Sequence, residues 1–305
     1  MKRSRILLLI AVLVIVAGAV VGWRLYQRAF GPGPVFEEGD RILLLPTGSD
    51  FYQVVDSLKA KKLIGDEQTF RMLAERKKYT DRVKPGRYRI PSGMSVNELI
   101  NKLRAGEQDP VRITFTNIRT LPQLAGQVAK YLESDSLRLI EAMHDRKTVD
   151  RLGLRSETMI SLFIPNTYEV WWTTTPDEFL ARMEKEHNRF WNDERKRKAA
   201  LLRLEPVEVS TLASIVQAET AKPDEAPIIA GVYLNRLRIG MPLQADPTLK
   251  FALGMDSVSR ILTADLRVES PYNTYTHTGL PPGPINMPEP RYIDAVLDPR
   301  KHDYL

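Results

Sequence analysis

The chain has 305 residues, of which 43% are hydrophobic and 27% charged, an ordinary balance for a folded protein with room for two cores. It has no cysteine, which excludes disulfides, thiolate nucleophiles and cysteine-ligated zinc. Its four histidines lack metal-binding spacing, and its net charge of +6 comes from basic residues that mostly alternate with acidic ones. We therefore expect no metal, no cofactor and no nucleic-acid partner.

The N-terminal segment has the composition of a membrane anchor. A basic end precedes an uncharged run over residues 6–23, which is long enough to cross a bilayer with little tilt. Basic residues before such a run favour the cytoplasmic side. Ala17-Gly18-Ala19 resembles a signal-peptidase site, so a cleaved signal is the alternative, although the apolar run continues beyond it. We expect a cytoplasmic tail at 1–5, a single-pass inner-membrane helix at 6–24, a linker at 25–40 and a periplasmic remainder.

Two stretches of the next segment repeat one pattern. Residues 45–51 align with 90–96, and each copy predicts a strand end, a glycine turn, a polar helix cap and an apolar helical stripe. A further helix is expected over 67–78 and a strand over 86–90. The order strand, helix, helix, strand within 41–108 resembles a LysM-like module, a fold associated with binding N-acetylglucosamine polymers. A structural spacer between the membrane and the next domain explains the segment equally well.

Residues 109–305 predict a larger domain of the α+β class. Residues 163–168 read Phe-Ile-Pro-Asn-Thr-Tyr, and Trp171 and Trp172 follow closely. Aromatic rings beside amides can form a sugar-binding platform, but adjacent aromatic residues more often belong to a core. The other periodic segments predict one strand and then four helices, at 111–115, 120–132, 136–143, 175–190 and 226–237.

A carboxylate stands where a helix should place another apolar side chain. The spacing i, i+3, i+4, i+7 of a core-facing stripe is occupied by Leu212, Ile215, Val216 and Glu219. We therefore expect Glu219 to point inward, and to lie near the negative end of the helix dipole because Pro223 must end the helix. Burial and dipole both favour the protonated form that a general acid needs. The alternative is a partly exposed glutamate paired with Arg236 or Arg238.

Two later segments carry further candidates. Asp246 is followed by Pro247, which is typical of a helix N-cap with proline at the first helical position, so Asp246 also has a structural explanation. The stretch 270–285 is rich in proline and glycine, and long ordered loops more often bind a ligand than merely connect.

Taken together, these segments resemble the endolytic murein transglycosylase family, the MltG or YceG-like proteins. The element at 163–168 is similar to the family's Leu-Phe-Pro-Asp-Thr-Tyr. The anchor and the LysM-like segment fit as well, so the resemblance covers nearly the whole chain. The segments that carry it are Ala-Ser-Ile-Val-Gln-Ala-Glu-Thr at 213–220, Ala-Gly-Val-Tyr-Leu-Asn-Arg-Leu at 230–237, Met-Pro-Leu-Gln-Ala-Asp-Pro-Thr at 241–248, Tyr-Asn-Thr-Tyr at 272–275 and Gly-Leu-Pro-Pro-Gly-Pro-Ile at 279–285.

The resemblance implies that Glu219 is the catalytic residue. It would protonate the glycosidic oxygen between N-acetylmuramic acid and N-acetylglucosamine, and then accept the proton of the muramyl C6 hydroxyl as that oxygen closes on C1. The product is a 1,6-anhydro end made without water, and one carboxyl group acting twice suffices, whereas hydrolysis usually recruits two. The residues that would line the glycan cleft are Gln244, Asp246, Tyr272, Asn273 and Tyr275.

The implied function is a membrane-anchored lyase that cuts nascent peptidoglycan strands internally and so limits their length. Its implied partners are peptidoglycan synthases, meaning penicillin-binding proteins and glycosyltransferases. Two rival functions are a two-carboxylate hydrolase that uses Glu219 and Asp246, and a non-catalytic wall-binding module.

Two departures from the family pattern affect these expectations. Many members carry an acid two positions before the catalytic glutamate, whereas this chain has Gln217. The chain ends at Leu305, where relatives continue through a final strand and helix, so we expect the C-terminal end of the catalytic domain to be truncated.

Overall fold

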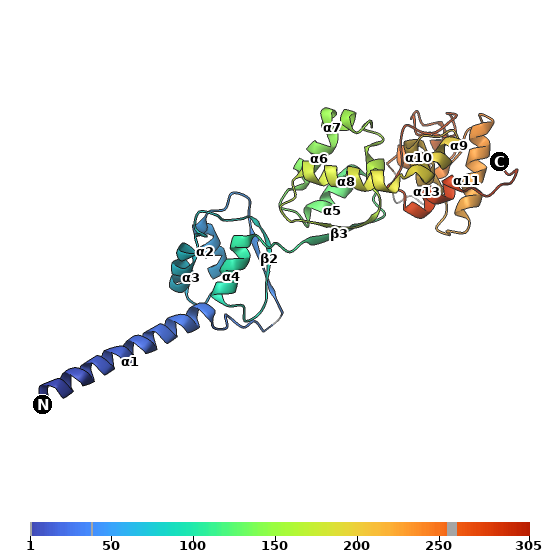
Figure 1. Ribbon diagram of the computed structural model, residues 1–305. Coiled ribbons are helices and arrows are strands. Elements are labelled where there is room, and N and C mark those ends of the chain that lie inside the picture. Colours follow the sequence, from blue (N-terminus) through green and yellow to red (C-terminus); the bar gives the residue numbers. More distant parts are fainter. Residues whose placement is uncertain (1, 38, 255–260) are drawn as a thin grey trace. The chain divides into compact units, whose positions relative to one another are not determined.

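The computed structural model describes residues 2–37, 39–254 and 261–305, and it contains both helices and sheets, as the α+β expectation requires (Figure 1). The chain divides into two units, each with its own contacts. Unit 1 comprises Met1–Val111 and Trp171–Thr173, and unit 2 comprises Arg112–Val170 and Thr174–Leu305.

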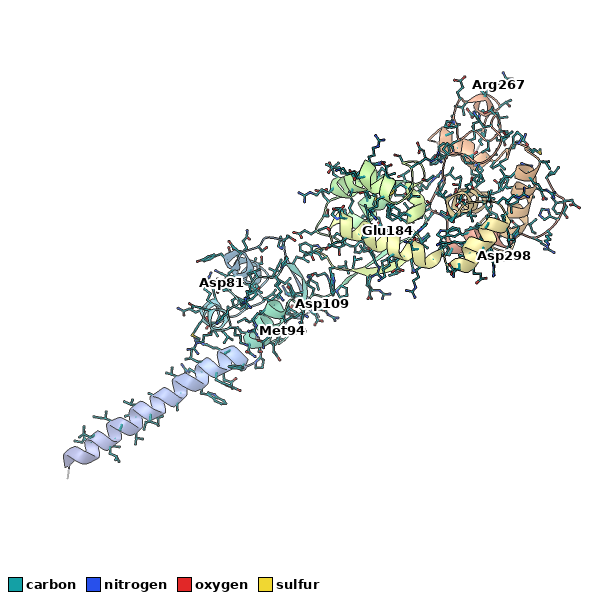
Figure 2. The ribbon with its side chains drawn as sticks, turned by 45° about the horizontal axis from the view of Figure 1, so that its top comes forward. Asp81, Met94, Asp109, Glu184, Arg267 and Asp298 are labelled. Carbon is teal, nitrogen blue, oxygen red and sulfur yellow. The ribbon has the colours of Figure 1, made fainter. Side chains whose placement is uncertain are left out.

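Helix α1 (Lys2–Phe30) is long and apolar enough over Ile6–Phe30 to cross a membrane. Its described side chains project into open space along most of its length, and only Ala29 near its end is buried (Figure 2). The expected linker at 25–40 is wrong in its first part, because residues 25–30 are helical. They include no glycine or proline, and the helix stops only at Gly31, whose N–H donates to the Gln27 carbonyl at 2.8 Å.

Unit 1 has a two-stranded antiparallel sheet in which β1 (Arg41–Leu45) pairs with β2 (Gly86–Ile90), with Arg41 opposite Ile90. The predicted repeat is confirmed in both copies. Gly48 and Gly93 have φ of +83° and +78°, and each leads into a capping box, at Asp50 and at Ser95. The strand, helix, helix, strand order is present, while the LysM-like assignment stays a prediction. Besides α1, this unit contains the helices α2 (Phe51–Ala60), α3 (Glu67–Arg76) and α4 (Val96–Ala105).

The described residues between 111 and 305 are mainly helical, and they include a small sheet in which β3 (Val111–Phe115) pairs with β4 (Asn166–Val170). In the aromatic segment, Phe163 and Tyr168 are buried, as the core interpretation predicts, whereas Trp171 is 50% exposed. The remaining elements are α5 (Leu121–Ala129), α6 (Ser136–His144), α7 (Arg146–Arg151), η1 (Met159–Leu162), α8 (Pro176–Phe190), α9 (Asp193–Leu201), α10 (Pro206–Glu219), α11 (Ala226–Arg238), α12 (Asp246–Ala252), η2 (Asp265–Arg267) and α13 (Pro290–Leu297).

Helix α10 is the central element of unit 2. It packs against α9, α11, α12, α13 and η1, and every residue from Val209 to Val216 is buried. The proline-rich stretch before α13 runs along it: the Ile285 N–H donates to Ser214 Oγ at 3.0 Å, and Asn286 Nδ2 donates to the Ser214 carbonyl at 2.9 Å. A helix buried on all sides has few ways to shift, so its last turn is presented from a fixed base.

We expect Gly48→Ala and Gly93→Ala each to destabilise unit 1 by about 1 kcal/mol, because an L side chain is strained at positive φ even where nothing crowds it. Gly65→Ala is the matched control, since Gly65 has no positive φ and equally open space. Hydrogen exchange of the β1 and β2 amides in the full chain measures the effect. Equal protection in all three variants would contradict the assigned turn geometry.

Candidate active site

Glu219 is the last residue of α10, as the position of Pro223 predicts. The backbone beyond it is held on two sides: the Thr220 N–H donates to the Val216 carbonyl at 3.2 Å, and the Tyr292 hydroxyl donates to the Thr220 carbonyl at 3.2 Å. The expectation that Glu219 points into the core is wrong, because its side chain is exposed. The apolar stripe is buried as far as Val216, and in the final turn Gln217 is partly buried while Ala218 and Glu219 are exposed.

The surroundings of Glu219 still favour its protonated form. Although the residue is exposed, desolvation by nearby protein atoms raises the pKa of Glu219, and the negative charge of Asp246 raises it further. A hydrogen bond with Tyr233 and the positive charges of Lys250 and Arg236 act in the opposite direction, without cancelling the rise. A carboxyl group with a raised pKa keeps its proton to higher pH, which suits a general acid.

Tyr233 is a site residue that the sequence pattern did not reveal. It lies on α11 and is only 5% exposed, which fits the apolar face to which the periodicity assigns it. Its hydroxyl nevertheless reaches the Glu219 carboxyl, and burial, followed by the charge of Glu219, raises the pKa of Tyr233. Arg236 lies one turn later on α11, and its Nη1 donates to the Leu243 carbonyl. The Tyr-x-x-Arg spacing, which places both side chains on one helix face, was the available signal.

Asp246 does not have the predicted N-cap role. Ala245 is the N-cap residue of α12, and Asp246 is its first helical residue, with an exposed side chain. Its carboxylate accepts a hydrogen bond from the Tyr275 hydroxyl instead. Burial, and then this bond to Asp246, raises the pKa of Tyr275 to about 12, so the phenol stays a donor at neutral pH.

The segment before α12 is tied to the loop that carries Tyr275. The Gln244 N–H donates to the Thr274 carbonyl at 2.9 Å, and the Ala245 N–H donates to Thr274 Oγ1 at 3.0 Å. Thr248 Oγ1 and Thr274 Oγ1 are hydrogen-bonded at 2.8 Å. Gln244 has an exposed side chain and a φ of +51°. The start of α12 and the 273–275 turn therefore form one rigid piece opposite the end of α10.

The other two candidates lie differently. Asn273 is fully buried, its Nδ2 donates to Leu266 and Val268 carbonyls at 3.1 and 2.8 Å, and its Oδ1 accepts the Tyr275 N–H at 3.0 Å. Its side chain organises the loop from within. Tyr272 is half-buried and packs its ring on Phe251, with a centroid distance of 4.8 Å, and burial raises its pKa. The structure thus brings Glu219, Asp246 and Tyr275 into one cluster, and it places Asn273 behind Tyr275.

Gln217 faces away from this cluster. Residues two apart on a helix lie about 200° apart around its axis, so Gln217 and Glu219 point in different directions. Gln217 is partly buried, and its Oε1 accepts the Glu289 N–H at 2.7 Å. An acidic side chain could accept the same bond. Gln217, like an acid at this position, therefore provides a hydrogen-bond acceptor for the loop before α13. It is not a second acid beside Glu219.

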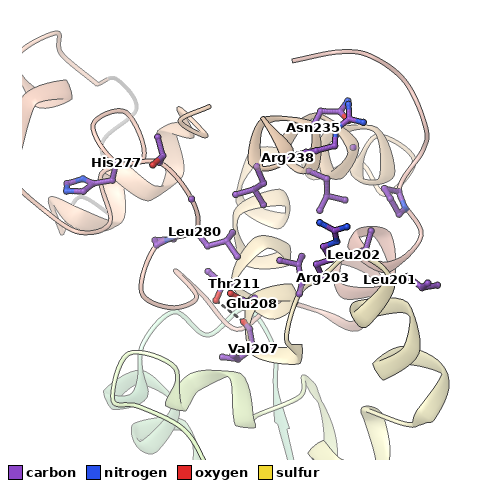
Figure 3. Close-up of a pocket in the computed structure, with 18 of the residues that line it drawn as sticks. Leu201, Leu202, Arg203, Val207, Glu208, Thr211, Asn235, Arg238, His277 and Leu280 are labelled. Atoms are coloured by element: carbon purple, nitrogen blue, oxygen red, sulfur yellow. Dashed lines mark hydrogen bonds between the residues drawn. The ribbon is translucent and has the colours of Figure 1, made fainter. Parts of the chain in front are cut away.

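The large cavity of unit 2 lies elsewhere. It has a volume of about 1,320 Å³ and is lined by Val207 and Thr211 of α10, by Arg238 of α11 and by residues 277–282 (Figure 3). Glu219, Asp246 and Tyr275 are not among its lining residues. Arg238 lines this cavity, and of the two arginines expected as alternative partners of Glu219, Arg236 is the one whose positive charge acts on its carboxyl. Over the described parts of the chain, no group of three His, Asp or Glu side chains is placed to hold a metal ion.

Comparisons with known proteins agree in one family. The family model described as the YceG-like family matches residues 43–305. An endolytic murein transglycosylase of Streptococcus pneumoniae (strain D39 / NCTC 7466) is 27% identical over 297 residues, which cover 86% of this chain and 52% of that protein. An endolytic murein transglycosylase of Bacillus subtilis (strain 168) is 28% identical over 284 residues, which cover 86% of this chain and 76% of that protein. The chain thus spans about half the length of the streptococcal relative.

A solved structure is similar to this chain over most of the length of both proteins. It is the crystal structure of a yceG-like protein from Listeria monocytogenes, with a TM-score of 0.59 and 26% identity. The match covers 87% of this chain and 92% of that one.

We expect Gln217→Leu to destabilise unit 2 by about 1 kcal/mol, because the partly buried Glu289 N–H would lose its acceptor. Gln217→Glu keeps an acceptor of the same size and should cost clearly less. Denaturant unfolding of the two variants beside the wild type makes the comparison. A glutamate variant as unstable as the leucine variant would contradict the assigned role.

Proposed function

This chain belongs to the YceG-like family, and on that premise we propose that it is a peptidoglycan lytic transglycosylase whose general acid is Glu219. The observation that carries the proposal is the end of α10: an exposed carboxyl group whose pKa is raised, with Asp246 and Tyr233 beside it. The relatives named endolytic murein transglycosylases support the substrate class. A glycan strand cut internally has to reach the acid from the side, and the exposure of Glu219, Asp246 and Gln244 leaves room for that approach.

The proposed reaction uses Glu219 twice. Its protonated carboxyl donates to the glycosidic oxygen between C1 of N-acetylmuramic acid and C4 of N-acetylglucosamine as the C1–O bond breaks. The resulting carboxylate accepts the proton of the muramyl C6 hydroxyl while O6 bonds to C1. Glu219 ends protonated, the leaving strand has a free C4 hydroxyl, and the other strand has a 1,6-anhydro end, so no water is consumed.

The neighbouring residues have separate tasks in this proposal. The positive charge that develops at C1 is stabilised by the carboxylate of Asp246, which the Tyr275 hydroxyl holds in place. The Tyr233 hydroxyl fixes the orientation of the Glu219 carboxyl. Gln244 and Tyr272 are proposed glycan contacts. The side chain of Asn273 holds the backbone of Tyr275 in place from behind.

The proposed setting is the outer face of the inner membrane. Helix α1 is long and apolar enough to anchor the chain, and unit 1 is a candidate glycan-binding module of the LysM-like kind. Nascent strands emerge from peptidoglycan synthases, so penicillin-binding proteins and glycosyltransferases are the proposed partners. By limiting strand length, the enzyme would act directly on their product.

We expect Glu219→Gln to abolish cleavage while glycan binding and folding persist. Glutamine keeps the size of the side chain but cannot pass a proton, and loss of general acid catalysis alone costs about 10²–10⁴-fold. The loss should exceed that range because the same group must also act as the base. The variant should be no less stable than the wild type, because the fold disfavours the ionised form of Glu219.

The assay for this variant is mass spectrometry of the products from uncrosslinked glycan, with thermal melts for folding. Near-normal turnover would contradict the mechanism. A reducing muramic acid in place of the anhydro end would select the two-carboxylate hydrolase, with Asp246 as its second group. Binding to purified sacculi without any released glycan would select the wall-binding module.

We expect a reporter fused after Phe36 to be active only outside the cytoplasm, because the basic N-terminus is retained on the inner side. The mature protein should keep its original N-terminus, as sequencing of the purified protein would show. A mature chain beginning at Val20 would instead identify a cleaved signal.

A further inference from the structure

The end of helix α1 is attached to the folded part of unit 1. α1 packs against α3 and α4, and Ala29 near its end is buried. Arg28 Nη1 lies 3.3 Å from Asp66 Oδ2. Asp66 is the N-cap residue of α3 and accepts the Gln68 N–H at 3.0 Å, so its carboxylate has a fixed position. An exposed ion pair adds little stability, but this one shows which part of unit 1 meets α1.

Residues 31–36, here called the clasp, continue the attachment through the backbone. The Gly33 N–H donates to the Gly93 carbonyl at 3.1 Å, and the Gly93 N–H donates to the Pro34 carbonyl at 3.0 Å. The two backbones approach so closely that a Cβ at Gly33 would lie 1.9 Å from the Met94 carbonyl oxygen. The position therefore requires glycine.

The last residue of the clasp is held by its backbone and by its ring. The Phe36 N–H donates to Ser92 Oγ at 2.8 Å, and the ring packs against the core of unit 1. The guanidinium of Arg41 lies 4.9 Å from the centroid of the same ring. A free linker of six residues would let its two ends move about 12–15 Å apart in any direction, and these contacts remove that freedom.

All of these contacts lie at one end of unit 1, here called the attachment end. Arg41 begins β1 and pairs with Ile90, the last residue of β2, after which the turn with Gly93 follows. Arg41 Nη1 also donates to the Lys61 carbonyl at 3.4 Å, directly after the end of α2. The first turn of α2 lies at the opposite end, about 14 Å away along the helix axis.

The length of α1 indicates the depth at which the attachment end would lie in a membrane. The uncharged run over residues 6–23 is about 27 Å long as a helix, close to the hydrocarbon thickness of a bilayer. The exposed rings of Trp23, Tyr26 and Phe30 stack in sequence at 6.1 and 4.9 Å, as expected of an interfacial aromatic belt. The headgroup layer adds about 5–7 Å, so Arg28 reaches its outer edge.

Two lysines are exposed in the turn between α2 and α3 at the attachment end. They are Lys61 and Lys62, and within the residues that the structure describes neither forms an ion pair. The neighbouring acids Asp66 and Glu67 are already paired with basic side chains, whereas Glu37, beyond the clasp, is exposed. A lysine ammonium group binds phosphate as a point charge.

We propose that the clasp holds unit 1 against the phospholipid headgroups of the membrane that α1 spans, with Lys61 and Lys62 in contact with their phosphates. This inference rests on the proposed anchoring by α1. Unit 1 then stays at a fixed height on the membrane surface instead of moving on a free linker, and any glycan that it binds is held next to the membrane.

The direct test measures how close each end of α2 lies to the headgroups. The chain has no cysteine, so Ala60→Cys and Tyr52→Cys each give the full chain a single site for a fluorescent label. Both residues are exposed, and about 12 Å of helix separates them. The chain is reconstituted in vesicles of phosphatidylethanolamine and phosphatidylglycerol that carry a nitroxide on the headgroup. The label at position 60 should be quenched about twofold or more strongly than the label at position 52, because quenching falls over such a distance.

The clasp is tested in the chain labelled at position 60. Gly33→Ala should reduce the quenching to the level found at position 52, because the added Cβ collides with the Met94 carbonyl. Gly22→Ala is the matched control, since its Cβ meets open space within α1, and its quenching should equal that of the parent chain. Hydrogen exchange of the β1 and β2 amides shows whether unit 1 remains folded in each variant.

The phosphate contact has its own variant, in which Lys61→Gln and Lys62→Gln are combined. Quenching at position 60 should fall in this variant, because the attachment end loses both of its phosphate ligands. If Gly33→Ala unfolds unit 1, this double variant decides, and unchanged quenching would overturn the inference.

Two further results would overturn it. One is equal quenching at positions 52 and 60 in a chain whose α1 resists extraction by alkaline carbonate. The other is a folded Gly33→Ala variant that keeps the strong quenching of the parent chain. A chain that carbonate extracts from the vesicles would instead contradict the proposed anchor, and this inference with it.

Discussion

The candidate site depends on how helix α10 leaves the core of unit 2. Every residue from Val209 to Val216 is buried, whereas Ala218 and Glu219 in the last turn are exposed. Three contacts stop this free end from fraying: Gln217 accepts the Glu289 N–H, Thr220 accepts the Tyr292 hydroxyl, and the Thr220 hydroxyl donates to Glu225 at 2.9 Å. The result is an acid with a rigid backbone and an accessible side chain, which burial of the whole residue could not provide.

Signals that act over a few residues could be read from the sequence. The two capping boxes, the positive-φ glycines between strand and helix, and the end of α10 before Pro223 all follow from neighbouring residues. Burial could not be read in the same way. The i, i+3, i+4, i+7 pattern says which side of α10 faces inward, but not how far along the helix the covering elements extend. That length is set by α12 and α13, which are distant in sequence, and for this reason Glu219 was wrongly expected in the core.

The electrostatic environment of Glu219 was harder still to predict, because it combines desolvation with contributions from two separate helices, α11 and α12. Tyr233 was assigned correctly to the apolar face of α11, and its ring is buried there. The periodicity gave no sign that its hydroxyl would reach the Glu219 carboxyl. Asp246 followed by proline is typical of an N-cap, but the helix begins one residue earlier than this pattern predicts, so that Asp246 is its first helical residue. That residue decides whether its carboxylate caps the helix or accepts the Tyr275 hydroxyl. The positive charge of Lys250 acts on Glu219 because α12 packs against α10.

The open position of Glu219 also bears on the chemistry that the proposal requires. An exposed acid is accessible to water, and an inverting hydrolase would need water held on the far face of the sugar by a second carboxylate. The proposed closure by the muramyl O6 has no such need, because a nucleophile within the same sugar reacts with an effective concentration of about 10⁵–10⁸ M when it is well oriented. Asp246 is already engaged by Tyr275, which favours a fixed charge over a water-activating base. An accessible, single-acid site beside a fixed charge therefore suits internal cleavage of a polymer, whereas the large cavity of unit 2 is lined by none of Glu219, Asp246 and Tyr275.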